Sequence, residues 1–420
     1  MYWMNLNNKR IGIWGMGREG QAVRQALECH VLNYEIIEIS EENISELLKC
    51  DVVVKSPGVS LYRPEIQEAL QKGVEFTSST NLFFANKKPS VSVIAVTGTK
   101  GKSTTSSLLA HTLKSFNKHV ELGGNIGRPL VELSDTNADF VVAELSSYQC
   151  ADLTGRPDIG VLINLYPEHL QWHQTHEVYY QDKARMIRLS AEAVLNATDP
   201  QTHVFLKGTE AILFNAPRGI HIQNNLFYDG EVPLFPIEKL PLIGRHNAEN
   251  ACAVLTVIKM LGLKPELCEK AFETFKPLPH RLEIIGKKDG ITYVDDSIST
   301  TPETAMVAIK ALDKGQDMTL IAGGFDRGQN YKELVDFLKT YKNRIRLVTL
   351  PDTGKVLADL AQRAGIETAL TSDMPTAVSV AQHITPRGGM IILSPAAPSY
   401  NMYPNFEERG KDFKKWAFLD

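Results

Sequence analysis

The sequence predicts an α/β protein of three domains, each built on a parallel sheet with helices around it. Short apolar segments alternate with helical patterns along the chain, which is typical of βαβ units. Two breaks that contain proline, at residues 85–90 and 275–279, separate this alternation into three series. The length of 420 residues agrees with three domains, because one domain usually contains about 100–200 residues.

The predicted elements follow in chain order. In the first series we expect strands at 10–14, 35–39 and 51–55, and helices at 20–28 and 63–72. In the second series we expect strands at 91–97, 140–144 and 159–165, a helix that opens near Lys102, short peripheral strands within 196–241, and a helix at 247–261. In the third series we expect strands at 291–294, 318–322, 345–350 and 390–393, with helices between them. The predicted domains are 1–86, 87–278 and 279–420.

Composition and charge exclude several classes of protein. Hydrophobic residues make up 43% and charged residues 22% of the chain, which excludes wholesale disorder. The formal charge of −4 provides no overall positive field for nucleic acid or an anionic membrane. The five cysteines contain no C-x-x-C pair, and no apolar stretch reaches the ~18 residues of a membrane span. We therefore expect a soluble cytoplasmic protein that binds neither nucleic acid nor membrane.

The strongest local motif follows the expected strand at 91–97. This strand leads into a glycine-containing loop and then into Gly-Lys-Ser at a helix start, an arrangement that presents backbone N–H groups to phosphate. Lys102 would reach the β- and γ-phosphates, and the Ser103 hydroxyl would bind Mg²⁺. Val96 stands where the usual motif has its first glycine, and a plain strand-to-helix turn with surface lysines is the alternative. The predicted phosphate-binding residues are Gly98, Thr99, Lys100, Gly101, Lys102, Ser103 and Thr104.

Three further strand ends carry candidate functional residues. Gly15-Met-Gly17-Arg-Glu-Gly20 follows the first strand and fits a dinucleotide-binding turn, although a simple tight turn is equally compatible. Glu144 and His169 follow two strands of the second series, where side chains of a parallel sheet face the ligand. We expect Glu144 to bind a divalent cation, and either His169 to bind a metal or Glu168 to act as a base. For each of these residues alone, a satisfied polar residue at a strand end is the alternative.

Several motifs together resemble those of the Mur ligases, and most closely those of the members that add glutamate. The motifs are, in order, Thr97-Gly-Thr-Lys-Gly-Lys-Ser-Thr, Gly123-Gly-Asn-Ile-Gly, Glu144-Leu-Ser-Ser-Tyr-Gln, Asn164 with Glu168-His169, His246-Asn-Ala-Glu-Asn250, His280-Arg281-Leu-Glu283, Asp295-Asp-Ser, and Leu393-Ser-Pro with Asn405-Phe-Glu-Glu-Arg409-Gly. The resemblance implies a Rossmann-like first domain, a central P-loop ATPase-type domain and a Rossmann-like third domain.

The resemblance also implies the reaction and its ligands. The substrates would be UDP-N-acetylmuramoyl-L-alanine, glutamate and ATP, with one or two Mg²⁺ ions, and the amide would form through an acyl phosphate in peptidoglycan precursor synthesis. D-glutamate is the family default and L-glutamate the alternative, and we expect a monomer. A folylpolyglutamate synthase-like ligase and a non-catalytic nucleotide-binding module are the competing functions.

The resemblance assigns roles to individual residues. The implied catalytic residues are Lys102, Lys183 and His169; the implied metal ligands are Ser103, Glu144, His169 and a carbamylated Lys183; Asn250, Arg281 and Asp296 would contact ATP in addition to the phosphate loop. The implied acceptor contacts are Gly15, Gly17, Ser56, Asn125 and Gln149, and the implied glutamate contacts are Thr300, Arg327, Ser399 and Phe406. Without the resemblance, Lys183 would be read as an exposed helix lysine.

The glutamate pocket departs from the usual family pattern at two positions. Ile298 stands in the place of a lysine, and Arg327 stands where lysine is usual. Arginine presents a planar fork where lysine presents a point charge, so this exchange changes the geometry of carboxylate binding. The departures lie where the stereochemistry of glutamate would be read, and they keep L-glutamate open.

Overall fold

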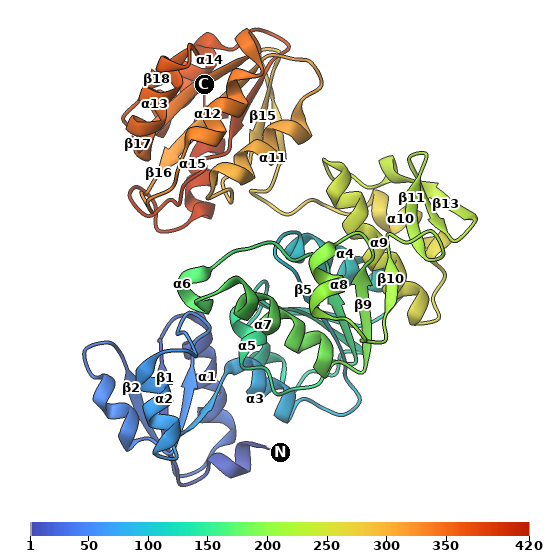
Figure 1. Ribbon diagram of the computed structural model, residues 1–420, viewed down its shortest axis with the longest axis vertical. Helices are drawn as coiled ribbons and strands as arrows, with labels where there is room; N and C mark the ends of the chain where they lie inside the picture. The colour runs from blue at the N-terminus through green and yellow to red at the C-terminus, as the bar shows by residue number, and fades with distance from the viewer. Residues whose placement is uncertain (1, 420) are drawn as a thin grey trace. The chain divides into compact units, whose positions relative to one another are not determined.

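The computed structural model describes residues 2–419, and parallel sheets flanked by helices dominate it (Figure 1). The chain forms two compact units. The first unit comprises the chain up to Pro241 together with His246–Phe275, and the second comprises Leu242–Arg245 and the chain from Lys276 onward.

The first sheet is parallel, with the strand order β2-β1-β3-β4. Its strands are β1 (Arg10–Trp14), β2 (Glu35–Ile39), β3 (Val52–Lys55) and β4 (Glu75–Thr77), and the helices of this part are α1 (Arg18–His30), α2 (Pro64–Gln71) and α3 (Ser79–Asn86). Ile11 and Ile13 pack in one apolar cluster with Val23 of α1, whereas Val53 packs in another with Ile66 of α2. Helices therefore cover both faces, as a buried parallel sheet requires.

The central sheet has six parallel strands in the order β10-β9-β8-β5-β7-β6. The strands are β5 (Ser92–Thr97), β6 (Val120–Gly124), β7 (Phe140–Glu144), β8 (Ile159–Leu162), β9 (Glu192–Asn196) and β10 (Ile212–Phe214). The helices of this part are α4 (Lys102–Ser115), α5 (Ser147–Ala151), α6 (Leu170–His173), α7 (His176–Leu189), α8 (Pro200–Phe205), α9 (Arg245–Met260) and α10 (Glu269–Glu273). Because β5 lies between β7 and β8, the loop after it has a strand-end loop on each side.

A small antiparallel sheet accounts for the turn-rich segment. Its strands are β11 (Ile220–Gln223), β12 (Leu226–Asp229) and β13 (Val232–Pro236). Asn224 and Asn225 join β11 to β12 with φ angles of +49° and +60°. Asparagine tolerates this left-handed conformation, which suits a two-residue hairpin turn.

The sheet of the second unit has the order β14-β15-β19-β16-β17-β18, with β14 antiparallel at one edge. Its strands are β14 (Glu283–Lys288), β15 (Ile291–Asp295), β16 (Met318–Gly324), β17 (Ile345–Asp352), β18 (Thr368–Leu370) and β19 (Met390–Leu393). Its helices are α11 (Pro302–Leu312), α12 (Lys332–Lys339), α13 (Thr353–Arg363), α14 (Met374–Ile384) and α15 (Phe406–Phe418). Neighbouring residues of β16, Leu320 and Ile321, enter different apolar clusters, so this sheet is also covered on both faces.

The observed elements confirm most of the predicted ones and correct two. The predicted strands 10–14, 35–39, 140–144 and 390–393 have the observed bounds. The strand predicted at 159–165 ends at Leu162, because Asn164 turns toward the loop after β5. The break predicted at 85–90 is partly helical: α3 continues to Asn86, whose buried side chain donates to Leu82 O at 2.8 Å.

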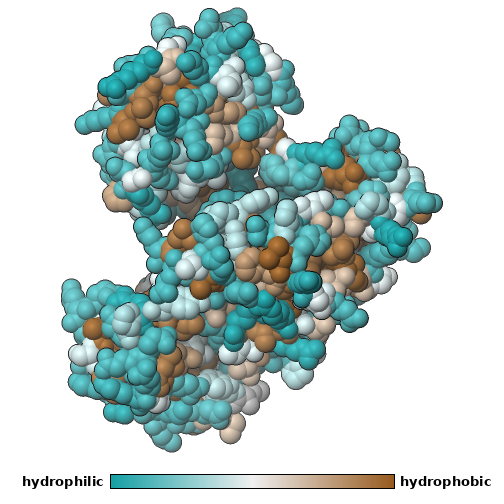
Figure 2. All heavy atoms as spheres, viewed as in Figure 1, coloured by the Kyte–Doolittle hydropathy of each residue, from teal (hydrophilic) through white to brown (hydrophobic). Residues whose placement is uncertain are grey.

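The molecular surface in Figure 2 is mostly hydrophilic, with small and separate hydrophobic areas. Among residues 2–419, none of the helices combines the length and apolar character that crossing a membrane requires.

Candidate active site

The loop between β5 and α4 has the geometry of a phosphate-binding loop. Gly101 precedes Lys102, the first residue of α4, with φ +86°. This left-handed conformation favours glycine, and a Cβ at Gly101 would lie 2.4 Å from Asn250 Nδ2. The first N–H groups of a helix have no partner within the helix and can bind phosphate. The predicted phosphate loop is thus placed beside Asn250, one of the predicted ATP contacts.

Asn164, at the end of the neighbouring strand, braces this loop. Its Oδ1 accepts hydrogen bonds from Thr99 N at 3.1 Å and Lys100 N at 2.9 Å, and its Nδ2 donates to Lys100 O at 3.0 Å. The buried Thr99 hydroxyl also lies 2.8 Å from the Tyr179 hydroxyl. Asn164 falls within one of the motifs but was given no role from the sequence, and Tyr179 was not singled out.

The lysines of the loop have different surroundings. Lys100 pairs with Glu168, while Lys102 Nζ donates to Thr99 O at 2.9 Å. Burial opposes ionisation of Glu168, but the nearby lysines and His169 outweigh it, so the pKa of Glu168 is lowered. Ser103 is half-buried and Thr104 is buried at the start of α4.

Glu144 ends β7 as a wholly buried carboxylate. Its Oε1 accepts a hydrogen bond from Asn125 Nδ2 at 2.7 Å. Its Oε2 is buried and has no hydrogen-bond partner among the described residues. An unpartnered buried carboxylate oxygen is costly, so the site favours a ligand that completes it. A hard divalent cation fits this oxygen.

Lys183 lies on α7 and is 1% exposed, so the alternative of a solvated helix lysine is wrong. Its Nζ donates to Gly98 O at 2.7 Å and to Thr97 Oγ1 at 3.4 Å. Burial, and secondarily the positive charge of Lys102, lowers the pKa of Lys183 to about 7. A substantial fraction of this amine is therefore neutral near pH 7, and a neutral amine is a nucleophile.

His169 is exposed at the N-terminus of α6, with φ +56°. Its Nε2 lies 3.6 Å from Glu168 Oε2, and its ring centroid lies 5.2 Å from that of Tyr148. Desolvation lowers the pKa of His169, which keeps a ring nitrogen lone pair available to a metal.

The predicted acceptor residues lie at strand ends of the first two sheets. Ser56 donates to Gly15 O at 2.7 Å, and a Cβ at Gly15 would lie 2.6 Å from Ser56 Oγ. Gly17 is exposed in the same turn. Gln149 caps α5 by accepting from Ser146 N at 2.9 Å.

Glu19 is an additional residue of this region that sequence analysis missed. Its Oε1 accepts from Gln149 Nε2 at 3.4 Å, and burial raises the pKa of this carboxyl group. The signal was available, because Glu19 lies inside the Gly15–Gly20 motif.

The predicted glutamate contacts lie around strand-end loops of the second unit. Gln329 Nε2 donates to Thr300 O at 2.7 Å and so joins the loops after β15 and β16. The loops after β16 and β19 are joined by Phe325 N, which donates to Pro398 O at 2.9 Å. The Arg327 guanidinium lies 5.4 Å from the Tyr400 ring centroid.

Ser399 and Phe406 lie in the segment that follows β19. Ser399 is buried, and Phe406 begins α15 with its ring centroid 6.1 Å from that of His280. The structure thus gathers the four predicted residues around loops of one sheet.

Asp296, one of the predicted ATP contacts, is a buried side chain and not an exposed one. It is 3% exposed and accepts from Leu282 N at 3.2 Å, from Ser394 Oγ at 2.7 Å and from Ser299 Oγ. Burial raises the pKa of Asp296 to about 6. Its oxygens position the loop that carries Arg281, the residue before Leu282.

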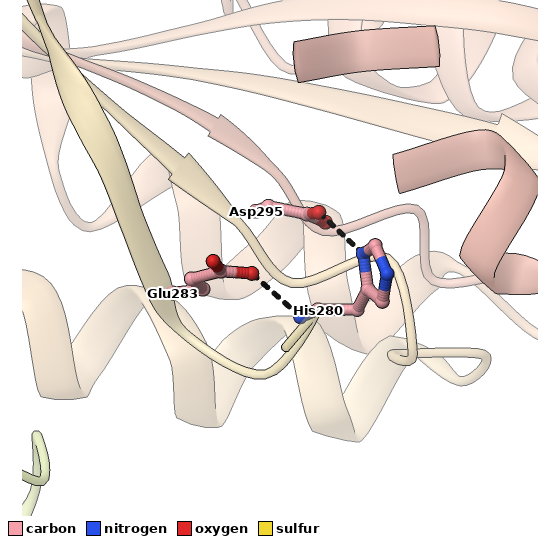
Figure 3. A group of neighbouring side chains, drawn as sticks. All are labelled: His280, Glu283 and Asp295. Atoms are coloured by element: carbon pink, nitrogen blue, oxygen red, sulfur yellow. Dashed lines mark hydrogen bonds and ion pairs between the residues drawn. The ribbon is translucent and has the colours of Figure 1, made fainter. Parts of the chain in front are cut away.

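Figure 3 shows a compact cluster of His280, Glu283 and Asp295 beside this loop. Its ligand-type atoms lie within 4.8 Å of one another. His280 Nδ1 is 2.6 Å from Asp295 Oδ2, and His280 N donates to Glu283 Oε2 at 3.0 Å. A Cβ at Gly410 would lie 2.2 Å from His280 Nδ1, so α15 packs directly on the cluster. Internal hydrogen bonds account for this geometry without a metal ion.

Arg409, which the sequence analysis left without a role, is a buried cation of the second unit. It is 1% exposed, and its Nη1 and Nη2 donate to Ala397 O at 3.0 Å and Ser297 O at 2.9 Å. Burial lowers the pKa of Arg409 to about 10. It ties the loop after β15 to the loop after β19, which carries Ser399.

Comparison with known proteins agrees with the geometry of the phosphate loop. The Mur ligase middle domain matches residues 96–258, and the Mur ligase glutamate ligase domain matches residues 280–397. The UDP-N-acetylmuramoyl-L-alanine–L-glutamate ligase of Xanthomonas campestris pv. campestris is 36% identical, with 99% of this chain and 96% of the relative covered. The enzyme of the same name from Micromonospora is 37% identical, with 97% and 96% covered.

A solved structure shows the same fold. The MurF ligase of Thermotoga maritima, solved in complex with ADP, is 18% identical and superposes with a TM-score of 0.62, with 97% of this chain and 94% of that chain covered. The chain therefore belongs to the Mur ligase family, whose members are ATP-dependent ligases that form amide bonds in peptidoglycan precursor synthesis.

Proposed function

We propose that this protein adds glutamate to UDP-N-acetylmuramoyl-L-alanine and converts ATP to ADP and phosphate. The observation that carries the proposal is the arrangement at the carboxyl ends of β5 and β7. A glycine loop, a buried carboxylate with an unpartnered oxygen and a buried lysine lie together there. The names of the two relatives support glutamate as the amino acid.

We propose L-glutamate as the isomer, in preference to the family default of D-glutamate. Both relatives described above are named for L-glutamate. Arg327 supports this choice, because its guanidinium lies over the Tyr400 ring and its fork has a different geometry from the usual lysine.

The three predicted domains divide the work in this proposal. Residues 1–86 bind the UDP part of the acceptor, residues 87–278 bind ATP and Mg²⁺, and residues 279–420 bind glutamate. The acceptor contacts are Gly15, Gly17, Ser56, Asn125 and Gln149, and the glutamate contacts are Thr300, Arg327, Ser399 and Phe406. A cytoplasmic location and a monomeric state stay predictions of the sequence.

Mg²⁺ fits the residues of the central strand ends. Glu144 offers its unpartnered Oε2, Ser103 offers a hydroxyl, and His169 offers a ring nitrogen. When bound, Mg²⁺ neutralises part of the phosphate charge. Lys183 repels the ion when it is protonated, but its CO₂ adduct is an oxygen ligand. In that reaction neutral Nζ attacks CO₂, an N–C bond forms, and one proton is released.

The chemical step follows from positioning. The alanine carboxylate of the acceptor attacks the γ-phosphorus, the bond to the β–γ bridging oxygen breaks, and an acyl phosphate and ADP result. Lys102 and the N–H groups at the start of α4 hold the phosphates during this transfer. Asn250, Arg281 and Asp296 contribute to ATP binding in the proposal. The glutamate amine then attacks the acyl carbon, phosphate leaves, and the nitrogen loses a proton.

Product formation with separate isomers tests the proposal. The protein is incubated with ATP, Mg²⁺, UDP-N-acetylmuramoyl-L-alanine and either L- or D-glutamate, and the products are identified by mass. We expect an amide product and equimolar ADP with L-glutamate, and much slower turnover with D-glutamate. Faster turnover with D-glutamate would reverse the isomer assignment, whereas turnover only with a folate acceptor would replace the proposed function.

A further inference from the structure

A continuous chain of hydrogen bonds crosses the first unit. The Tyr62 hydroxyl lies 2.7 and 2.9 Å from the two carboxylate oxygens of Asp182. Asp182 Oδ2 lies 2.6 Å from His173 Nδ1, and His173 Nε2 lies 2.9 Å from Ser147 Oγ. His173 is wholly buried, and Ser147 and Asp182 are 3% and 7% exposed. Because a carboxylate only accepts, both Tyr62 and His173 Nδ1 donate to Asp182.

The members of this chain adjoin residues of the proposed active site. Asp182 precedes Lys183 on α7, and Ser147 begins α5, three residues after Glu144. His173 ends α6, which begins directly after His169. Tyr62 lies in the segment after β3 that starts with Ser56, a proposed acceptor contact.

A second set of contacts holds the same segment. Ser60 Oγ donates to Trp172 O at 2.8 Å, and Trp172 Nε1 donates to Pro57 O at 3.1 Å. Trp172 stacks on Tyr148 with ring centroids 4.7 Å apart. The segment after β3 is thus attached to α6 and α7 at several points, of which Tyr62 alone reaches the buried chain.

The order Ser147, His173, Asp182 is that of a nucleophilic triad, but its burial excludes this role. Ser147 is 3% exposed and His173 is wholly buried, so no substrate reaches the serine hydroxyl. Such a triad also needs a reacting atom near the nucleophile. What the chain can do is fix the relative positions of the elements that it joins.

We propose that Tyr62, Asp182, His173 and Ser147 are positioning residues that hold the acceptor-binding segment, α7 and the Glu144 strand end in one geometry. This inference rests on the proposed function, because Lys183 and Glu144 are taken to act on the nucleotide and its metal. Among these four residues, Tyr62 provides the clearest test of the inference. Replacement by phenylalanine removes its hydroxyl and keeps the ring, and this hydroxyl carries the contact from the acceptor side.

The main test compares Tyr62→Phe with Tyr2→Phe. The Tyr2 hydroxyl also donates a hydrogen bond to a carboxylate, that of Glu75. This pair lies in the same unit but does not belong to the chain of hydrogen bonds. For Tyr62→Phe we expect acceptor binding, measured by calorimetry without ATP or Mg²⁺, to weaken about tenfold, and kcat to fall about tenfold. We expect Tyr2→Phe to change neither by more than about twofold. Unaltered binding and kcat in Tyr62→Phe would overturn the inference.

A double-mutant cycle separates positioning from general stability. If the hydroxyl acts through Asp182, Tyr62→Phe has no further effect on kcat/KM in an Asp182→Ala background, and Asp182→Asn recovers part of the loss. If the two substitutions instead lower kcat/KM by factors that multiply, Tyr62 acts independently of Asp182, which would contradict the inference.

Hydrogen exchange supplies a readout that needs no substrate. We expect the backbone of α7 to exchange faster in Tyr62→Phe than in the wild type, with α15 of the second unit unchanged. Unchanged exchange in α7 would count against the inference even if the wild type were inactive. Inactive wild type with faster exchange in α7 would count against the proposed function alone.

Discussion

Two of the buried cations, Lys183 of the first unit and Arg409 of the second, show how differently the chain uses a charge that is removed from water. Lys183 and Arg409 are each 1% exposed, and neither forms an ion pair with a carboxylate in residues 2–419. Burial lowers the pKa of Lys183 to about 7 but that of Arg409 only to about 10. At pH 7 the lysine loses its proton in part, whereas the guanidinium stays charged.

The two side chains also differ in the groups to which they donate hydrogen bonds. Lys183 has a short bond to one backbone carbonyl, that of Gly98, and points to the phosphate loop. Arg409 bridges the carbonyls of Ser297 and Ala397 and so joins two strand-end loops. The comparison indicates that a buried amine can give up its proton near pH 7, whereas a buried guanidinium stays charged and can hold loops together.

Removal of Lys183 should have the largest effect on catalysis. For Lys183→Ala we expect kcat to fall by about 1000-fold or more, since the metal would lose the ligand proposed above, and acetate should restore part of the activity. The melting temperature should not fall by more than a few degrees. Activity near that of the wild type without acetate would contradict the proposed carbamate.

Removal of Arg409 should instead destabilise the second unit. For Arg409→Ala we expect about 3 kcal/mol of lost stability, because two buried carbonyls lose their donors and a cavity forms. Chemical denaturation measures this loss, and Arg363→Ala on the surface is the control, expected to cost less than about 1 kcal/mol. Equal effects of the two variants would show that Arg409 does not brace the loops.

The pH dependence of stability should reveal the depressed pKa of Lys183. Between pH 7 and 10.5 the unfolded chain binds more protons at Lys183 than the folded chain, because the folded pKa is depressed from 10.5 to about 7. Stability therefore rises with pH in this window, by at most about 1.4 kcal/mol per pH unit. Denaturation of the wild type and Lys183→Met at pH 7 and 9, in buffer freed of CO₂, measures the difference. Parallel pH curves for the two proteins would contradict the depressed pKa.

The smallest expected effect concerns the choice of isomer. Arg327→Lys should change the L/D ratio of kcat/KM by about tenfold, because the donors to the glutamate carboxylate move. The KM for ATP should change by less than about twofold, since Arg327 is proposed to contact glutamate alone. A fixed ratio with a raised KM for ATP would place Arg327 at the nucleotide instead.

The sequence predicted the strands well where they are apolar and central, as at 140–144 and 390–393. It missed β4 and β18, which have three residues each and carry little periodic signal. It also missed the longer strands β6, β9 and β14. The predicted end of β8 was also wrong. Asn164 contacts the phosphate loop, which is distant in sequence, and these contacts end the strand.

The site shows the same contrast between local patterns, which the sequence reveals, and contacts between distant residues, which it does not. The motifs located the phosphate loop, but they could not show that Glu144 has an unpartnered oxygen or that Lys183 is buried. His173 and Asp182 escaped notice because their partners, Ser147 and Tyr62, are distant in sequence. A single buried arginine such as Arg409 has no sequence signature of its function.

Transfer of oxygen from the acceptor to phosphate tests the central claim most directly, namely that this site activates a carboxylate by phosphorylation. The acceptor is labelled with oxygen-18 in its alanine carboxylate and incubated with ATP, Mg²⁺ and L-glutamate, and the phosphate is examined by mass spectrometry. We predict one oxygen-18 atom in each phosphate released, in equal amount to the amide. Amide formation with unlabelled phosphate would contradict the acyl phosphate and the role given to the phosphate loop.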